Sequence, residues 1–284
     1  MRFKVLLPII GMLAAIVMLG CPNPSSSPVD TPLSDVTSPI IGTLKAVEGG
    51  TFNNGTSDMT VSSFRMSQHE ITGGQYQLLM GIDPSNFDSV SYHPVETVNW
   101  YHAIAFCNKL SLAEGLTPVY SVSVVNWATL THVDVPTAIN GDWNAATADW
   151  NANGYRLPTE AEWEFAARGG NSSIGYTHAG SNTVDNVAWY SVNTSSTTHP
   201  VGTKLLNELG LYDMSGNVWE WCWDWYDDYP ATDLTDYRGA ASGTGRVVRG
   251  GSWNNDASGC TVAYRGSSSP SGQGSAFGFR VVCP

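Results

Sequence analysis

Apolar and polar residues alternate only over short stretches of this chain, a pattern that predicts brief strands separated by irregular segments. Residues 44–48 alternate and end at a Gly-Gly pair, which predicts a strand followed by a turn. Residues 61–66 have apolar side chains at every second position and predict a second strand. Residues 247–248 are apolar and residues 277–282 are apolar except for Arg280, and both predict short buried strands near the C-terminus.

Three other segments have the spacing and end signals of helices. Thr72 is predicted to cap a short helix, and residues 100–112 repeat apolar side chains along one helical face. Thr159 and Glu162 have the spacing of a capping box, in which the threonine oxygen and the glutamate carboxylate satisfy backbone amides at the start of a helix. This third helix is expected to end at the Gly-Gly pair of residues 169–170.

The first twenty residues predict a signal peptide. Arg2 and Lys4 precede an apolar run at residues 5–19, which is shorter than the roughly 20 residues that a membrane-spanning helix needs. The Met-Leu-Gly sequence before Cys21 resembles a relaxed bacterial lipobox, so a peptidase would remove residues 1–20 and the Cys21 thiol would carry diacylglycerol. An ordinary signal peptide with a chance cysteine is the alternative, but the polar, Pro-rich sequence that follows favours lipidation. We therefore expect a bacterial outer-membrane lipoprotein, anchored by its lipid and exposed at the cell surface.

The remaining chain divides into a tether and a folded domain. Residues 21–39 are rich in Pro and Ser and contain no aromatic residue, which is typical of an extended linker. Residues 40–284 contain no second linker of this kind and no repeat, and they predict one large domain.

The composition limits the classes of partner that this domain can bind. The 13 Lys and Arg against 25 Asp and Glu give a net charge of −12, which excludes a protein that neutralises nucleic-acid phosphates. Removal of residues 1–20 takes two basic residues, leaving 11 against 25 and a charge of −14. Anionic lipid repels such a domain, so the acyl group must hold it at the membrane. The 29 Gly and 11 Trp favour a loop-rich globule over a helical bundle.

The cysteines argue against two common kinds of site. Cys107, Cys222, Cys260 and Cys283 allow three disulfide pairings, and no two of them have CxxC spacing. A zinc knuckle and a thioredoxin-like redox pair are therefore not supported.

Four sequence blocks occur in order along the folded domain. They are residues 154–164 (GYRLPTEAEWE), 213–221 (DMSGNVWEW), 249–253 (RGGSW) and 278–280 (GFR). Together they resemble the formylglycine-generating enzyme, or sulfatase-modifying factor, family over roughly residues 44–282. The resemblance implies an α+β fold of the C-type-lectin-like kind, with a small twisted antiparallel sheet, two main helices and most of the chain in ordered loops.

The catalytic members of the family are copper-dependent oxidases that act on sulfatases through two cysteines separated by four residues. Two thiolates suit copper(I), so the loss of one removes both a ligand and the reactivity. Counted from the Gly-Gly-Ser motif, Asn255 stands in the place of the first cysteine and Cys260 in that of the second. No C-x4-C spacing occurs in the chain, so we expect no enzyme activity and no required cofactor. An unusual modifying enzyme is the alternative.

A non-catalytic branch fits the C-terminal sequence better. In the variable proteins of diversity-generating retroelements, mutagenic reverse transcription rewrites a C-terminal segment and changes ligand specificity. The frame of that segment resembles residues 250–253 (GGSW), Ala263-Tyr264-Arg265, Pro270 and residues 278–282 (GFRVV) of this chain. The resemblance implies a variable region at about residues 246–284.

Small polar residues and aromatic rings lie between the frame residues of this region, as in antibody-like binding surfaces. The candidate ligand-binding residues are Trp253, Asn254, Asn255, Asp256, Ser258, Gly259, Tyr264, Ser267, Ser268, Ser269, Ser271, Gln273 and Ser275. Their expected ligand is a protein or glycan of a host or bacterial surface, and its identity cannot be read from the sequence. The alternative is a flexible Ser- and Gly-rich loop without a ligand.

The resemblance also implies a calcium site and a disulfide. Asp213, Gly216, Val218 and Glu220 match positions at which the enzyme relatives bind calcium through side-chain and backbone oxygens. The alternative is that Glu220 only forms hydrogen bonds inside the fold. The resemblance further implies a disulfide between Cys107 and Cys283, with unpaired buried cysteines as the alternative.

Tryptophans alternate at positions 219, 221, 223 and 225, as they would in a row of sugar-stacking rings. Large aromatic side chains are more often buried, so we expect these four to pack the scaffold.

Overall fold

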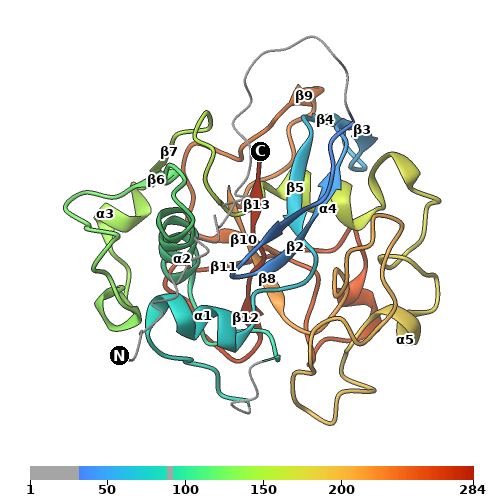
Figure 1. Ribbon diagram of the computed structural model, residues 1–284. Helices are drawn as coiled ribbons and strands as arrows, with labels where there is room; N and C mark the ends of the chain where they lie inside the picture. Colours follow the sequence, from blue (N-terminus) through green and yellow to red (C-terminus); the bar gives the residue numbers. More distant parts are fainter. Residues whose placement is uncertain (1–31, 88–91) are drawn as a thin grey trace, which may run out of the picture.

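The computed structural model of the protein describes residues 32–87 and 92–284 (Figure 1). Its strands are β1 (Val36–Ser38), β2 (Gly42–Val47), β3 (Gly50–Asn53), β4 (Asp58–Val61), β5 (Phe64–Ser67), β6 (Tyr120–Ser121), β7 (Thr147–Ala148), β8 (Trp219–Trp225), β9 (Leu234–Thr235), β10 (Arg246–Arg249), β11 (Arg265–Ser268), β12 (Phe277–Gly278) and β13 (Val282–Cys283). Its α-helices are α1 (Gly73–Met80), α2 (Trp100–Ala113), α3 (Gly141–Asn144), α4 (Glu160–Ala167) and α5 (Val184–Val187). The fold is the expected loop-rich α+β arrangement.

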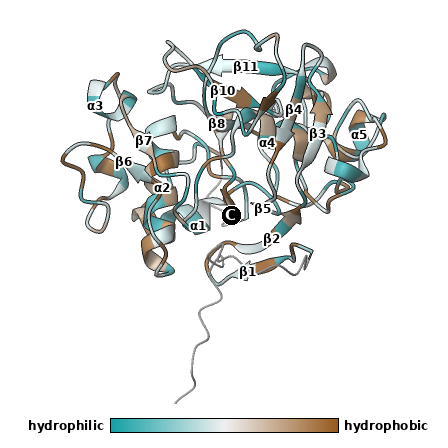
Figure 2. Ribbon diagram, turned by 90° about the horizontal axis from the view of Figure 1, so that it is seen from above, coloured by the Kyte–Doolittle hydropathy of each residue, from teal (hydrophilic) through white to brown (hydrophobic). Residues whose placement is uncertain are grey.

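Two four-stranded sheets form the centre of the molecule. One has the strand order β1-β2-β5-β13 and the other β11-β10-β8-β12. The first sheet carries β1 and β2 at one side of the molecule, while β11 lies at the opposite side (Figure 2). Helices α1, α2 and α3 lie to one side of the central strands, and α4 and α5 lie to the other (Figure 1).

The predicted helix starts are confirmed. Thr72 caps α1, and its side chain and that of Gln75 form a reciprocal capping box. Asn99 caps α2 by accepting a hydrogen bond from the His102 amide. Thr159 and Glu162 form the expected capping box at α4.

Two of the predicted strands are each divided in the structure. Residues 61–66 contribute to both β4 and β5, because the Asp236 carboxylate binds the Ser62 amide and hydroxyl where the two strands separate. Residues 277–282 give β12 and the first residue of β13, since the chain leaves β8 and crosses to β5 in the other sheet. The sequence of residues 277–282 predicts burial, but it does not predict that the chain passes from one sheet to the other.

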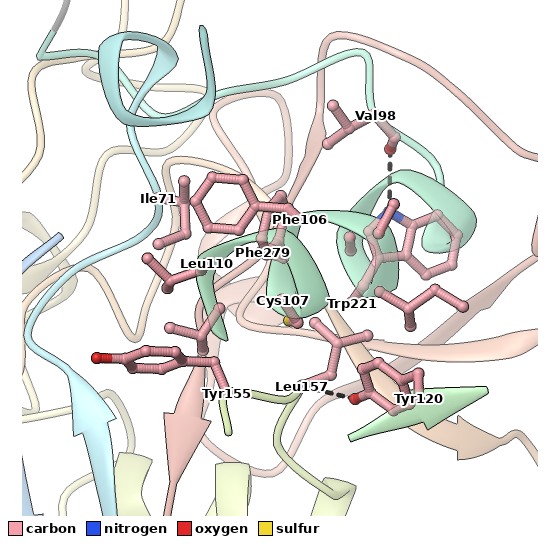
Figure 3. Packing of buried hydrophobic residues seen from close by; sticks show 14 of the residues in the cluster. Ile71, Val98, Phe106, Cys107, Leu110, Tyr120, Tyr155, Leu157, Trp221 and Phe279 are labelled. Carbon is pink, nitrogen blue, oxygen red and sulfur yellow. Dashed lines mark hydrogen bonds between the residues drawn. The ribbon is translucent and has the colours of Figure 1, made fainter. Parts of the chain in front are cut away.

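Helix α2 packs its apolar face into the larger of the two main hydrophobic clusters (Figure 3). The Trp221 indole donates a hydrogen bond to the Val98 carbonyl, and the Tyr120 hydroxyl accepts one from the Leu157 amide. Buried polar groups with such partners avoid the cost of an unmade hydrogen bond. Within the described residues, no helix has the length and apolar character to cross a bilayer.

Candidate ligand-binding site

The segment from residue 246 to the C-terminus begins inside the second sheet. Strand β10 lies between β8 and β11, and its four residues are buried. Gly250 and Gly251 follow it with φ angles of +93° and +75°, in the left-handed region that favours glycine. A Cβ atom on Gly251 would lie 2.5 Å from the Gly259 carbonyl oxygen and 2.8 Å from the Cys260 Sγ. The Gly-Gly motif therefore permits a turn that no other residue fits without strain.

Carboxylates of α4 hold the frame of this segment in place. The Glu164 Oε2 lies 2.5 Å from an Arg249 Nη2 that is fully buried, and the same guanidinium donates to the Val262 and Tyr264 carbonyls. Glu160 binds Arg265 through two hydrogen bonds of 2.6 and 2.7 Å. Because a buried arginine is costly without a paired carboxylate, these contacts fix the loop between β10 and β11.

A second buried ion pair holds the end of the chain. The Arg280 guanidinium forms two hydrogen bonds of 2.6 Å with Glu220, whose Oε2 also accepts from the Trp163 indole at 2.6 Å. Both charged side chains of this pair are completely buried. Arg249 and Arg280, from two of the recognised blocks, thus tie the C-terminal segment to the scaffold.

Most of the predicted ligand-binding side chains reach the surface of this frame. Asn254, Asp256, Ser258, Tyr264, Ser267 and Gln273 are exposed, and Trp253, Asn255, Ser268, Ser269, Ser271 and Ser275 are partly exposed. The segment that contains them lies between β10 and β13 and includes β11 and β12.

Gly259 is the exception, and its assignment to the binding face is wrong. It is buried, its amide donates to the Asp256 carboxylate, and a Cβ would lie 3.1 Å from the Asn255 side chain. Gly259 therefore belongs to the frame.

Two other residues combine exposure with a structural role. The Asn255 side-chain oxygen accepts hydrogen bonds from the amide and hydroxyl of Ser252. The Asp256 carboxylate accepts from the Ser258 hydroxyl and the Gly259 amide, and these bonds lower its pKa. Both side chains support the turn, which leaves their remaining surface for contact.

The position that corresponds to a catalytic cysteine does not have the properties of a copper ligand. Cys260 is buried, and burial raises the pKa of its thiol to about 12. The thiolate is the form that binds metal and reacts, and burial of Cys260 disfavours it. Asn255 at the other position offers an amide that is already bonded to Ser252.

The four residues matched to a calcium site are close in sequence but do not offer free oxygens together. Both oxygens of Glu220 accept from Arg280. The Asp213 Oδ2 accepts from the Gly202 amide, while its Oδ1 is buried without a partner. Burial raises the pKa of Asp213 to about 6. A guanidinium already bound to Glu220 opposes a second cation there, so the geometry does not fit calcium and favours the alternative that Glu220 is an internal hydrogen-bond acceptor.

The suspected Cys107–Cys283 disulfide is wrong. Cys107 is a buried free thiol, so it does not pair with Cys283. Cys107 lies on the inner face of α2 among apolar side chains (Figure 3), and burial raises the pKa of its thiol. The lipidation site predicted at Cys21 lies outside the described residues.

The structure adds three residues to the site. Phe87 packs edge-on against Trp253 with ring centroids 5.0 Å apart, and Trp219 lies 5.9 Å from Tyr264. The Asn217 carbonyl accepts a hydrogen bond from the Trp253 amide, and its side chain donates to the buried Glu70 carboxylate. Asn217 and Trp219 belong to a recognised block, but nothing in the sequence near Phe87 indicates this contact.

The alternating tryptophans pack the scaffold as expected. Trp221 is fully buried, and Trp223 stacks on Tyr120 with ring centroids 5.1 Å apart. Trp219 also packs against the core but stays partly exposed beside the variable segment.

Comparison with known proteins agrees with this architecture. The family model of the sulfatase-modifying factor enzyme 1-like domain matches residues 39–284. The chaperone protein LppX of Paenibacillus barcinonensis is 38% identical over 261 residues, which cover 84% of this chain and 88% of LppX. The formylglycine-generating enzyme of Streptomyces coelicolor is 38% identical over 162 residues, about half of each chain (51% and 51%).

Two solved structures are similar over most of their length. Treponema denticola variable protein 1 superimposes with a TM-score of 0.83 at 40% identity, covering 88% of this chain and 98% of that one. The structure of CarF gives a TM-score of 0.66 at 30% identity, covering 85% and 97%.

Proposed function

The chain belongs to the sulfatase-modifying factor family, and from that premise we propose that it is a surface-displayed lipoprotein that binds a ligand through its C-terminal segment and carries out no chemistry. A retroelement would diversify this segment and so change the binding specificity. The lipid at Cys21 would hold the domain at the outer membrane.

One observation carries the proposal. Exposed side chains lie between buried residues such as Arg249 and Arg280 along residues 249–280, and the frame is fixed by ion pairs that the exposed side chains do not share. Replacing an exposed residue such as Asn254 or Gln273 therefore changes the surface while the fold is kept. A scaffold of this kind suits repeated change of specificity, because affinity depends on the displayed groups and stability on the frame.

The relatives support a binding role over catalysis. The solved structure that is 40% identical is described as a variable protein, and LppX is described as a chaperone protein, while the formylglycine-generating enzymes match about half of the chain. Together with the high pKa of the buried Cys260 thiol, this supports a protein that binds without chemistry.

A binding screen tests the proposal. The labelled mature protein would be applied to an array of purified matrix proteins, mucins and bacterial surface glycans, beside a variant in which Asn254, Ser258, Tyr264, Ser267 and Gln273 are all Ala. We expect signals that the fivefold variant loses while its thermal unfolding is unchanged. A control variant, Val192→Ala, alters an exposed residue outside the segment and should keep the signals. Equal binding by all three proteins would refute the assignment of the face.

Two further measurements separate the alternatives. Copper-dependent oxidation of a sulfatase peptide, followed by mass spectrometry, should show no turnover, and turnover would establish the modifying-enzyme alternative. The neighbouring DNA should contain a reverse-transcriptase gene and a near-copy of the codons for residues 246–284. Their absence would refute diversification but not binding.

A further inference from the structure

Four aromatic side chains form a row across the proposed binding face. The Phe87 ring packs on Trp253, whose indole donates a 2.8 Å hydrogen bond to the Ser275 carbonyl. The adjacent carbonyl, of Ala276, accepts from the Trp219 amide at 2.7 Å. The Trp219 ring then lies 5.9 Å from the Tyr264 ring. The row Phe87–Trp253–Trp219–Tyr264 is thus connected through the backbone of residues 275–276.

Two members of the row lie outside the C-terminal segment. Phe87 comes from the loop that follows α1, and Trp219 comes from β8, and both are partly exposed. Glycine at position 266 leaves space for the indole, because a Cβ there would lie 3.3 Å from the Trp219 ring. Rewriting residues 253–275 would therefore leave these two rings in place.

The fixed positions of both rings have structural causes. The Phe87 amide donates to the Glu96 carboxylate at 2.7 Å, which anchors the loop end that carries the ring. Trp219 is paired in the sheet with Phe277, and its ring also packs against the larger hydrophobic cluster. Rigid aromatic rings lose little conformational entropy on binding, and such residues dominate binding energy at protein interfaces.

The surroundings of the row favour a folded protein as partner. The charged residues of the segment 253–275 are Asp256 and Arg265, and Arg265 is already paired with Glu160. Cavities of about 210, 450, 400 and 320 Å³ are lined by residues outside this segment. Small ligands bind in concave sites, whereas low-charge surfaces with central aromatic residues are typical of protein interfaces.

We infer that Phe87 and Trp219 are constant anchors of the binding face, which contact the ligand whatever the variable residues are, and that the ligand is a folded protein. This inference rests on the proposed binding function. It extends the recognition surface to residues that diversification would not reach.

Display selection tests the anchors without knowledge of the natural ligand. The full mature chain would be displayed on yeast with Asn254, Ser258, Ser267, Ser271 and Gln273 randomised, and selected against hen egg-white lysozyme and, separately, against dextran. Parallel libraries would carry Phe87→Ala or Trp219→Ala.

A matched control library would carry Tyr92→Ala. This aromatic residue is near Phe87 in the sequence and is 69% exposed, but its side chain lines a cavity beside α1. Thermal unfolding of each parent variant would show whether the fold is kept. For Trp219, a Trp219→Phe library retains a packed ring if the alanine variant is unstable.

We expect lysozyme binders from the unmodified and Tyr92→Ala libraries, and binders at least tenfold weaker from the Phe87→Ala library. Introducing Phe87→Ala into selected clones should raise their Kd at least tenfold with an unchanged melting temperature. Equal affinities would overturn the anchor role and leave the proposed function intact. Recovery of dextran binders alone would overturn the assignment to protein ligands, and no binders from any library would overturn the proposed function itself.

Discussion

Gly251 occupies a position where backbone conformation and packing both require glycine. Its φ of +75° is unfavourable for other residues, and its missing Cβ leaves room for the Gly259 carbonyl at 2.5 Å. We expect Gly251→Ala to lower the free energy of unfolding by about 2 kcal/mol or more, because strain and close contact add. Urea unfolding measures the change.

Gly274 provides the matched control for this substitution. It belongs to the same segment, but a Cβ there would make only an ordinary contact of 3.7 Å with the Phe277 ring. Gly274→Ala should change the free energy of unfolding by less than about 0.5 kcal/mol. Similar losses in both variants would show that the turn after β10 is not specially constrained.

His102 makes stability depend on pH. Burial, together with the neighbouring His132, lowers its pKa to about 3, whereas an unfolded histidine has a pKa near 6.5. Below about pH 6.5 the histidine is protonated in the unfolded chain but stays neutral in the folded chain. The free energy of unfolding therefore falls as the pH is lowered, until the pH reaches the folded-state pKa. At pH 5 the loss should be about 2 kcal/mol relative to pH 7.5.

The free energy of unfolding of His102→Gln, measured at pH 7.5 and at pH 5, checks whether His102 causes this effect. The variant has no titrating side chain at position 102, so its stability should fall by about 2 kcal/mol less between pH 7.5 and 5. If both proteins lost the same free energy, other groups would account for the pH dependence.

At the scale of elements, carboxylates of α4 hold the C-terminal segment in place through ion pairs. Glu164 pairs with Arg249, and both side chains are almost fully buried. Glu164→Gln keeps the shape of the side chain but removes the nearer of two carboxylates from Arg249, leaving Glu160 at 3.5 Å from its Nε. We expect a loss of about 3 kcal/mol or more in unfolding free energy.

An exposed ion pair offers the contrast. Asp35 pairs with Lys45 at the surface, where 45% of its side chain is accessible. Asp35→Asn should cost under about 1 kcal/mol, because water screens and replaces the lost contact. If Glu164→Gln and Asp35→Asn lowered the free energy of unfolding equally, the buried ion pair of α4 would not stabilise the segment more than a surface pair does.

The elements with strong local signals were predictable from the sequence. Capping residues such as Thr72 and Thr159 act through hydrogen bonds within one turn, so their effect is visible in a few adjacent residues. The division of residues 277–282 between two sheets was not predictable, because it depends on strands β8 and β5 far away in the sequence.

The candidate site likewise contains residues that the sequence predicts and residues that it does not. Its variable residues follow a recognisable frame, and most of them are accessible as expected. Gly259 looked like a displayed residue because it lies between polar neighbours, and only the three-dimensional turn buries it. Phe87 was missed because its contact with Trp253 joins two loops that are distant in sequence.

At the scale of the whole molecule, the burial of charge and the display of neutral groups are linked. Arg249 and Arg280 lie inside the fold with their carboxylate partners, while the surface of the segment 253–275 is mainly neutral. Net charge therefore resides mostly on the rest of the domain, where acidic residues exceed basic ones. Such a domain has no electrostatic affinity for an anionic membrane surface.

In the proposed lipoprotein, attachment to the membrane would then come from the acyl group, which gives a prediction for Cys21. Cys21→Ser should abolish incorporation of labelled palmitate, because it removes the thiol that would carry the acyl group. The control Cys222→Ala removes a buried thiol instead and should leave labelling unchanged. Undiminished labelling of the Cys21→Ser variant would contradict lipid attachment at this residue.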